Sequence, residues 1–389
     1  MRTIGVVSVG RSDYSYYLPI LRRIQAEPEL RLCLIVGGMH LSPEFGLTVK
    51  EIEVDGFLIN ERVEMLLSSD TPEGIAKSIG LGVISFGQVF AHQRLDLLLL
   101  LGDRFEMLAA ATAMLPFAIP MAHIAGGEAT EGLIDEAIRH SITKMSHLHF
   151  VSTARYRERV VQMGEEPWRV IVSGAPSLDN LREIPLLSFD ETERRIGVTL
   201  KPAPVLVTFH PVTLEYGDTS VHITELLAAL DDASLPVLFT YPNADTQGRI
   251  IIQQIDRYVS ARNASHVVTN LGTQAYYSLL RYAAAMVGNS SSGIIEAASF
   301  ELPVVNVGNR QKGRAHGRNV LDVPCERAAI VSGIRKAVDP EFRRSLAGLQ
   351  NPYGNGSAAE KIVQVLRQTP LDRNLLVKTF YDMPLAGVG

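Results

Sequence analysis

The segment with the clearest chemical signature runs from Gly288 through Asn289, Ser290, Ser291, Ser292, Gly293, Ile294 and Ile295 to Glu296. It lies between two short apolar runs, Tyr282–Val287 and Leu302–Val307. A strand that leads through small polar residues into a helix can hold a diphosphate, because the helix N-terminus offers unpaired N–H groups and a partial positive charge. A carboxylate one turn later, at Glu296, can accept hydrogen bonds from both ribose hydroxyls. The segment therefore indicates a sugar nucleotide, and an N-capped helix after a buried strand is the alternative interpretation.

Three carboxylates, Asp103, Glu128 and Asp135, follow predicted strands on successive loops. Carboxylates in different surroundings can hold different pKa values, so that one acts as a base and another as an acid. Asp135 could instead cap the helix that follows it, and Glu128 could simply solvate a loop. Because ligands of parallel α/β sheets bind at the carboxyl ends of the strands, their shared position favours catalysis.

Other polar side chains follow the same predicted strands. They are Arg11, Asp13 and Ser15, then Arg104 and Glu106, then Glu131, Glu136, Arg139 and His140, and finally His210 and Thr213. His210 could bind a phosphate as a cation or as a donor, or could simply bond to a carbonyl group. The spacing of the histidines at 123, 140, 147 and 149, without a cysteine nearby, argues against a metal site. Neither a Gly-x-Gly-x-x-Gly turn nor a Walker-type loop is present, so no nicotinamide cofactor is predicted.

The elements that must position these side chains alternate between strand and helix. A first series begins at Ile4–Val9 and includes the all-apolar run Leu97–Leu101, which is typical of a parallel strand buried on both faces. Residues 174–202 carry glycine and prolines and predict a hinge, after which a second series begins at Val205–Phe209. This alternation predicts an α/β protein with two doubly wound, Rossmann-like domains. If the two domains face each other, a ligand would lie in the cleft between them.

We place the N-terminal, acid–base domain at residues 1–175, with the C-terminal helix at 365–389 returning to it. The C-terminal domain, which we expect to hold the nucleotide, is then residues 176–364. A length of 389 residues is sufficient for two such domains with full cores.

Composition narrows the class of protein. The net charge of −5 and the absence of basic runs argue against general binding to nucleic acid or to an anionic membrane. Two cysteines imply no disulfide framework and fit a reduced cytoplasm. The chain opens on a predicted strand without a secretory signal, and Leu97–Leu101 is far too short to span a bilayer. We therefore expect a cytoplasmic protein.

Eight short motifs occur together along the chain. They are Arg11-Ser12-Asp13-Tyr14-Ser15, Gly102-Asp103-Arg104-Phe105-Glu106, His123-Ile124-x-Gly126-Gly127-Glu128, Ile134-Asp135-Glu136-Ala137-Ile138-Arg139-His140, His210-Pro211-Val212-Thr213, Gly288-Asn289-Ser290-Ser291, Pro303-Val304-Val305-Asn306 and Arg310-Gln311-x-Gly313-Arg314. With this set the chain resembles the hydrolysing UDP-N-acetylglucosamine 2-epimerases of sialic-acid-type biosynthesis. The resemblance covers essentially the whole chain, and eight motifs in order are specific where any one of them is weak.

The resemblance implies a glycosyltransferase-B-type fold, no cofactor and a homo-oligomer, either a dimer or a tetramer. It also implies a reaction in which UDP-N-acetylglucosamine loses UDP to give a 2-acetamidoglucal, which water converts to N-acetylmannosamine. The residues that the motifs place at the substrate are Arg11 and Ser15 near the diphosphate, His210, Ser290 and Ser291 at the phosphates, Glu296 at the ribose, and Arg104, Asn243 and Arg314 elsewhere in the binding set. The catalytic set would be Asp103, Glu128 and Asp135, with Arg139 and His210.

One position departs from some relatives, which carry a catalytic glutamate two residues after the histidine of the His-Ile-x-Gly-Gly motif. This chain has Ala125 there, and Glu128 is the nearest carboxylate that could take over. The main alternative substrate is UDP-2,4-diacetamido-2,4,6-trideoxyglucose, on the way to legionaminic acid. A non-hydrolysing epimerase is a further alternative. A non-catalytic or glycosyl-transferring member of the same fold is another, and the three carboxylates argue against it.

Overall fold

The computed structural model describes residues 1–67, 69, 71–130, 134–212, 217–242, 248–268 and 271–383, without the side chain of Arg249. Asn243, expected in the binding set, lies outside these described residues, as do Glu131 and Thr213. The chain divides into two compact units. Unit 1 comprises Met1–Glu128, Ile134–Asn180 and Gly356–Gly389, and unit 2 comprises Ala129–Leu133 and Leu181–Asn355.

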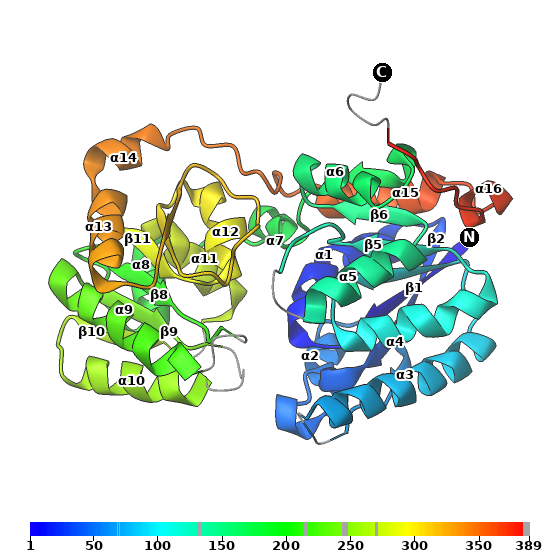
Figure 1. The fold of residues 1–389 in the computed structure, drawn as a ribbon, viewed down its shortest axis with the longest axis horizontal. Helices are drawn as coiled ribbons and strands as arrows, with labels where there is room; N and C mark the ends of the chain where they lie inside the picture. Colours follow the sequence, from blue (N-terminus) through cyan, green and yellow to red (C-terminus); the bar gives the residue numbers. More distant parts are fainter. Residues whose placement is uncertain are drawn as a thin grey trace. The chain divides into compact units, whose positions relative to one another are not determined.

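Unit 1 is built on a seven-stranded parallel sheet with the order β3-β2-β1-β4-β5-β6-β7 (Figure 1). Its strands are β1 (Arg2–Ser8), β2 (Leu30–Gly37), β3 (Ile59–Val63), β4 (Leu97–Leu101), β5 (Met121–Ile124), β6 (Leu148–Val151) and β7 (Val170–Val172). The leucines of β4 are almost entirely buried, as expected for a central strand covered on both faces. The sequence analysis missed β3, an edge strand whose charged residues interrupt its apolar pattern.

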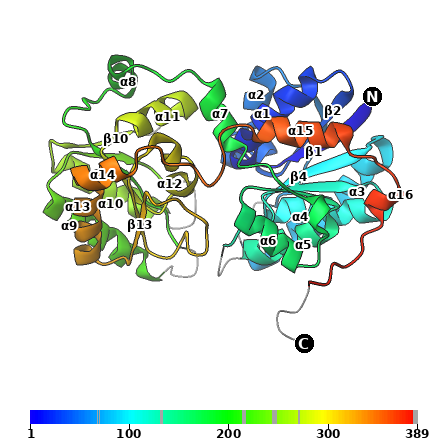
Figure 2. The same cartoon turned by 90° about the horizontal axis from the view of Figure 1, so that it is seen from above.

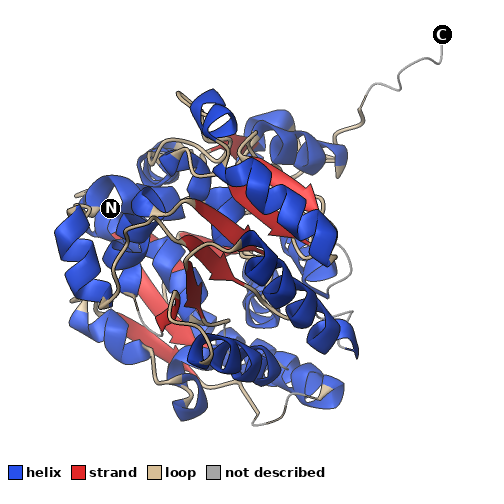
Figure 3. Cartoon of the chain, turned by 90° about the vertical axis from the view of Figure 1, so that its left-hand side faces the viewer, coloured by secondary structure: helices blue, strands red, loops and turns tan. Residues whose placement is uncertain are grey.

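Helices cover both faces of this sheet (Figure 1), and Figure 3, seen from the left-hand side of Figure 1, shows helices on both sides of the strands. They are α1 (Arg11–Ala26), α2 (Val49–Val54), α3 (Pro72–His92), α4 (Phe105–Met114), α5 (Ile134–Met145), α6 (Ala154–Gln162), α15 (Ala358–Gln368) and α16 (Arg373–Leu376), and α7 (Ser177–Glu183) spans the boundary to unit 2. Thr71 accepts a hydrogen bond from the Gly74 N–H as the N-cap of α3, and Pro72 occupies its first position.

The C-terminal segment belongs to unit 1 from residue 356 onwards, where α15 packs beside α1 (Figure 2). Buried Asp179 fixes the start of α15 by accepting hydrogen bonds from the N–H groups of Ala358 and Ala359 at 3.0 and 2.9 Å. Arg2 donates to the carbonyl of Leu366 near the other end. A domain boundary after residue 364 would divide α15. By its contacts the chain rejoins unit 1 at Gly356, before this helix begins.

Unit 2 contains a six-stranded parallel sheet with the order β10-β9-β8-β11-β12-β13. Its strands are β8 (Val205–Thr208), β9 (Val237–Thr240), β10 (Ser265–Val268), β11 (Ala285–Gly288), β12 (Val304–Val307) and β13 (Val320–Val323). Its helices are α8 (Phe189–Ile196), α9 (Thr219–Ala233), α10 (Gly248–Ser260), α11 (Gly272–Tyr282), α12 (Ser291–Ile295), α13 (Arg327–Val338) and α14 (Pro340–Ser345). The two sheets confirm the predicted α/β architecture of two Rossmann-like domains.

By length and composition alone, α3 is long and apolar enough to cross a membrane, which the shorter run Leu97–Leu101 is not. One face of α3 carries buried Phe86 and Phe90, and α4 packs alongside it. A helix in the core of a folded domain meets the same criteria of length and composition, so these criteria alone do not assign α3 to a membrane.

Candidate active site

Each sheet has one position at which the order of its strands reverses direction, and several of the polar side chains listed above follow the strands on either side of it. In unit 1 the central strands β1 and β4 lie side by side, and in unit 2 the central strands are β8 and β11. Ligands of doubly wound sheets bind outside the carboxyl ends of such strand pairs. Asp13 and Asp103 follow the first pair, and His210 and Ser290 follow the second.

Arg139 is the centre of the first cluster in unit 1. Its side chain, on α5, is only 2% exposed. The guanidinium forms an ion pair with Asp103 and donates hydrogen bonds to Glu136 Oε2 at 3.1 Å and to the backbone oxygen of Glu128 at 2.9 Å. The structure therefore brings Asp103, Arg139 and the Glu128 backbone together and holds the Asp103 carboxylate in one place.

Glu128 is a buried side chain, and it does not solvate the loop. Its Oε1 accepts a hydrogen bond from the Ser152 hydroxyl at 3.1 Å. The turn before it needs unusual backbone conformations. Gly127 has φ +75°, and a Cβ there would lie 2.6 Å from the Tyr156 carbonyl oxygen, while Ala125 has φ +65° without being glycine. Non-glycine residues in this region cost about 1–3 kcal/mol and cluster at functional sites.

A second cluster in unit 1 surrounds Arg104. Its guanidinium donates two hydrogen bonds to the fully buried Glu106, at 3.1 and 3.0 Å. Burial alone would lower the pKa of Arg104, but the negative charges of Glu106, Asp13 and Asp135 outweigh it and raise the pKa. Glu106 lies in a predicted motif yet was absent from the predicted site set.

Asp103 and Asp135 differ in their electrostatic surroundings. Asp103 is ion-paired to the buried guanidinium of Arg139. Burial raises the pKa of Asp135, although its own backbone N–H and the Arg104 charge oppose the shift. Two carboxyl groups whose surroundings separate their pKa values can serve as base and acid in the same reaction.

Arg11 and Ser15 lie apart from these buried clusters, on the exposed first turn of α1. The Arg11 side chain is 67% exposed, and its Nε lies 3.9 Å from Glu51 Oε2. The Ser15 hydroxyl donates to the Ser12 carbonyl at 2.8 Å. Both side chains are therefore open to solvent in the ligand-free chain.

Asp13 belongs to a predicted motif but was also absent from the predicted site set. It is 3% exposed, and burial raises its pKa to about 6, against the opposing effects of the Val9 N–H and the Arg104 charge. A raised folded-state pKa means that folding favours the protonated form. Its stabilising contribution is complete below the unfolded-state pKa near 4 and is lost as the pH rises through about 6.

We therefore expect the stability of the protein relative to its Asp13→Asn variant to fall between pH 4 and pH 7, because asparagine does not titrate. A shift of about two pKa units corresponds to roughly 3 kcal/mol at most. Urea unfolding of both proteins at several pH values measures this difference. A constant difference across that range would contradict the raised pKa.

In unit 2, Gly288 and Asn289 join the ends of β11 and β8. Gly288 has φ +134°, and a Cβ there would lie 1.9 Å from the Thr208 carbonyl oxygen, so only glycine fits. The fully buried Asn289 side chain accepts from the His210 N–H at 2.7 Å and donates to the His210 carbonyl at 2.9 Å. This pair of hydrogen bonds places His210 beside the start of the serine segment, Ser290–Ser292. The sequence analysis did not assign this positioning role to Asn289.

The His210 side chain is buried, and its burial, with the Arg310 charge, lowers its pKa to about 3. The neutral imidazole is therefore the dominant form at pH 7 in the ligand-free chain. The sequence left open whether His210 would meet a phosphate as a cation or as a hydrogen-bond donor. This environment favours the neutral donor.

Ser290 is the N-cap of α12, and its hydroxyl accepts a 3.3 Å hydrogen bond from the Ser292 N–H. The strand-to-helix pattern of this segment predicts a single helix over Gly293–Phe300. The structure has instead the short α12, ending at Ile295, and the 3-10 turn η6 (Ala297–Phe300). Glu296 lies at the junction, 8% exposed, and its charge contributes to the raised pKa of Tyr276, whose main cause is burial.

The segment after β12 supplies further polar groups. Gln311 and Arg310 both donate to the Asn289 carbonyl, at 2.8 and 3.1 Å. Arg314, which the motifs placed in the binding set, is half-buried in the same segment. Arg310 and Gln311 were therefore missed as side chains that support the serine segment, although their motif was recognised.

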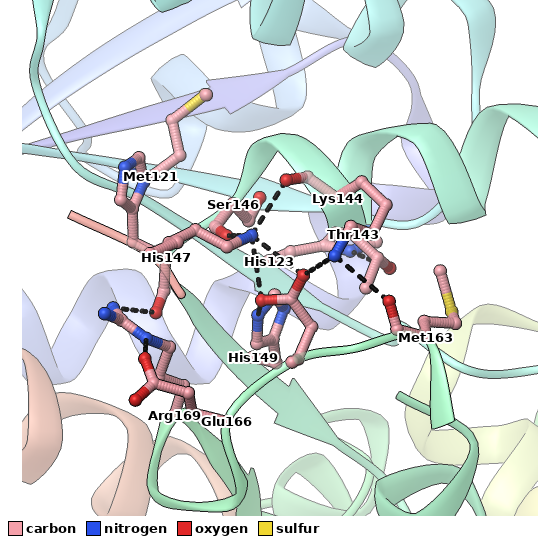
Figure 4. A network of polar contacts seen from close by, with 12 residues as sticks. Met121, His123, Thr143, Lys144, Ser146, His147, His149, Met163, Glu166 and Arg169 are labelled. Carbon is pink, nitrogen blue, oxygen red and sulfur yellow. Dashed lines mark hydrogen bonds and ion pairs between the residues drawn. The ribbon is translucent and has the colours of Figure 1, made fainter. Parts of the chain in front are cut away.

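The histidines close in sequence are separately engaged (Figure 4). His123 contacts the Gly102 carbonyl and the Thr143 hydroxyl, at 2.8 and 3.1 Å. The Met121 N–H donates to His147, and His149 lies 3.0 Å from Glu165, which also binds Lys144 and Lys378. Within the described residues, no group of three or more His, Cys, Asp or Glu side chains is placed to hold a metal ion.

The fold of the two units is that of the glycosyltransferase-B class. It is similar to the crystal structure of UDP-GlcNAc 2-epimerase from Neisseria meningitidis bound to UDP-GlcNAc, with a TM-score of 0.81 over 95% of this chain and 100% of that chain. The sequence identity of this match is 18%, so it establishes the fold alone.

The sequence establishes the family. Residues 22–367 match the family model described as UDP-N-acetylglucosamine 2-epimerase, and the chain belongs to this family. It is 39% identical over 387 residues to the GDP/UDP-N,N'-diacetylbacillosamine 2-epimerase (hydrolyzing) of Campylobacter jejuni, covering 98% of this chain and 99% of that protein. It is 36% identical to the UDP-N,N'-diacetylbacillosamine 2-epimerase (hydrolyzing) of Legionella pneumophila, covering 97% and 99%. These matches confirm the resemblance and support an epimerase.

Proposed function

We propose that this chain is a hydrolysing 2-epimerase that converts a UDP-2-acetamido sugar of the gluco configuration into UDP and the free manno-configured sugar. The observation that carries the proposal is the Arg139 cluster, which fixes Asp103 beside the backbone of Glu128 at the switch point of unit 1. A carboxylate that is fixed by a buried guanidinium, with a second buried carboxyl group on the residue whose backbone binds the same guanidinium, suits removal and return of a proton at carbon.

In the proposed reaction, one carboxylate takes the proton from C2 while the C1–O bond to UDP breaks and a C1–C2 double bond forms. Water then adds at C1, and a proton returns to C2 from the opposite face. Asp103, Glu128 and Asp135 share these proton transfers, and Arg139 holds the Asp103 carboxyl group in position. The consumed water and the released UDP balance the equation.

The groups of unit 2 suit the nucleotide. Neutral His210, Ser290 and Ser291 can donate hydrogen bonds to the phosphates, and Glu296 can accept from the ribose hydroxyls. Arg314 supplies positive charge within unit 2, and the proposed binding set also includes Arg104 and Arg11 of unit 1. Donors placed in advance stabilise the departing diphosphate because they need not reorganise as its charge develops.

The first candidate substrate is UDP-2,4-diacetamido-2,4,6-trideoxyglucose, which is UDP-N,N'-diacetylbacillosamine. The names of the Campylobacter and Legionella relatives, at 39% and 36% identity, favour it. UDP-N-acetylglucosamine is the second candidate, because the family as a whole is described by that substrate.

The test is to incubate the protein with each UDP-sugar in D2O and to follow the products by NMR. We expect free UDP and a manno-configured free sugar that carries deuterium at C2, since the proton at that carbon exchanges with solvent. A free sugar that keeps its original hydrogen at C2 would exclude elimination and hydration. Retention of the sugar on UDP would instead indicate a non-hydrolysing epimerase.

The nucleotide side predicts a separate result for Glu296→Ala. Because the ribose hydroxyls lose a charged acceptor worth roughly 1.5–3 kcal/mol, UDP affinity should fall by about tenfold or more. Isothermal titration calorimetry measures this change, and Glu326→Ala, which removes an exposed carboxylate of unit 2, is the matched control. Equal UDP affinity in both variants would remove Glu296 from the ribose site.

A further inference from the structure

Asp13 is a buried carboxyl group that the proposed proton transfers do not use. Its Oδ2 accepts hydrogen bonds from the Val9 N–H at 2.7 Å and from the Ser8 hydroxyl at 3.3 Å. Its Oδ1 is buried without a hydrogen-bond partner among the described residues. A buried carboxylate in which one oxygen has no hydrogen-bond partner among the described residues carries its negative charge at a free-energy cost. These surroundings therefore favour the protonated form of the Asp13 carboxyl group.

A chain of hydrogen-bonding groups connects Asp13 with a half-buried side chain, Thr48. Ser8 Oγ lies 3.0 Å from His40 Nε2, and His40 Nδ1 lies 2.7 Å from Thr48 Oγ1. Burial, with the Arg104 charge, lowers the pKa of His40 to about 4, so this ring is neutral and carries one N–H. With that proton on Nε2, each group donates to the next in the direction of Asp13.

Such a chain can deliver one proton inward without separating charge. Ser8 gives its proton to Asp13 and receives one from His40 Nε2. His40 receives one at Nδ1 from Thr48, and water replaces the Thr48 proton. One proton has then moved from solvent to Asp13, and His40 has changed tautomer.

The charged groups around Asp13 link its proton to Arg104. The Arg104 charge opposes, and the Glu106 charge reinforces, the burial that disfavours ionised Asp13. Tyr17, the other titratable group facing Asp13, has its pKa raised well above the ordinary value, first by burial and then by Asp13. Asp13, Glu106 and Asp135 all act on the single guanidinium of Arg104. Protonation of Asp13 removes one of these negative charges, which leaves more positive potential at Arg104 for an anionic ligand.

We propose that Asp13 is a positioning residue that acts through Arg104, binding a proton through Thr48, His40 and Ser8 when the diphosphate of a UDP-sugar meets Arg104. The inference rests on the proposed function, which places Arg104 in the nucleotide-sugar site. Because linkage is reciprocal, bound diphosphate favours protonated Asp13 to the same extent that protonated Asp13 favours bound diphosphate.

The decisive experiment is calorimetry of UDP binding in buffers of different ionisation enthalpy, between pH 6 and pH 8, with the natural protein and Asp13→Asn. The natural protein should take up more protons on binding than the variant, by up to about one per site. Protons bound by UDP itself contribute equally to both proteins, so the difference reports Asp13. Equal uptake while UDP binds both overturns this inference and leaves the proposed function standing. Failure of UDP to bind the natural protein overturns both.

UDP affinity distinguishes this proposal from a purely structural role of Asp13, for which the Asp13→Asn variant would bind UDP more weakly. Asparagine imitates the protonated carboxyl group, so Asp13→Asn should bind UDP more tightly than the natural protein at pH 8, by about fivefold or more. Weaker binding of UDP by a folded variant at pH 8 would indicate a damaged site and would overturn the proposal.

Ser8→Ala is a second variant that keeps the test open if Asp13→Asn fails to fold. Loss of the Ser8 hydroxyl removes a donor to the ionised form of Asp13, which favours the protonated form at higher pH. The pH range of proton uptake on UDP binding should therefore move upwards. An unchanged range contradicts the role of the Ser8 hydroxyl and, with it, the proposal.

Discussion

Asp103→Asn is expected to lower kcat by roughly 10²–10⁴-fold while UDP affinity changes by less than about threefold. Asparagine keeps the size of the side chain and can still accept a hydrogen bond from Arg139, but it cannot take a proton from carbon. The buried guanidinium also loses one of its ionic partners and keeps Glu136, so thermal melting should accompany the kinetic measurements.

The matched control is Asp96→Asn, one residue before β4 and therefore at the opposite end of the strand that leads to Asp103. Asp96 Oδ2 accepts a hydrogen bond from the Thr3 N–H, which an asparagine oxygen can replace. This control should retain its turnover. Near-natural kcat in Asp103→Asn would move the proton transfer to another group.

Glu128→Gln and Asp135→Asn are each expected to lower kcat by a similar factor, about 10²–10⁴-fold, with UDP binding preserved. Glutamine at 128 can still accept the Ser152 hydrogen bond, so the buried loop should keep its shape. Steady-state kinetics with the preferred UDP-sugar, together with UDP calorimetry, measures both effects. Glu158→Gln, an exposed change on α6, is the control.

The comparison between these two variants addresses the position where this chain carries Ala125. If Glu128→Gln keeps nearly full turnover while the aspartate variants fail, Glu128 has not replaced the glutamate found in some relatives. The chemistry would then depend on Asp103 and Asp135, supported by Arg139 or His210. Deuterium exchange at C2 without release of UDP in one variant would identify the step that its carboxyl group serves.

The sequence by itself determined the fold class and the family. Strand-to-helix alternation is a local pattern, since apolar runs such as Leu97–Leu101 and breaks at glycine and proline depend on neighbouring residues. Because parallel strands carry their functional residues at the carboxyl ends, the same pattern also indicated where Asp103, His210 and Ser290 would lie. The ordered motifs identified the epimerase family, which the comparisons confirm.

Only the tertiary structure decided which side chains meet and in what surroundings. The pairing of Asp103 with Arg139 joins residues 36 positions apart, and no local rule predicts it. The edge strand β3 depends on pairing with β2, because its own sequence is too polar to indicate a strand. Asp13 and Glu106 look like ordinary loop and helix carboxylates in the sequence. Burial raises the pKa of Asp13 against the Arg104 charge, and Glu106 is buried with its carboxylate bonded to Arg104; both arrangements arise only when β1 and β4 lie side by side.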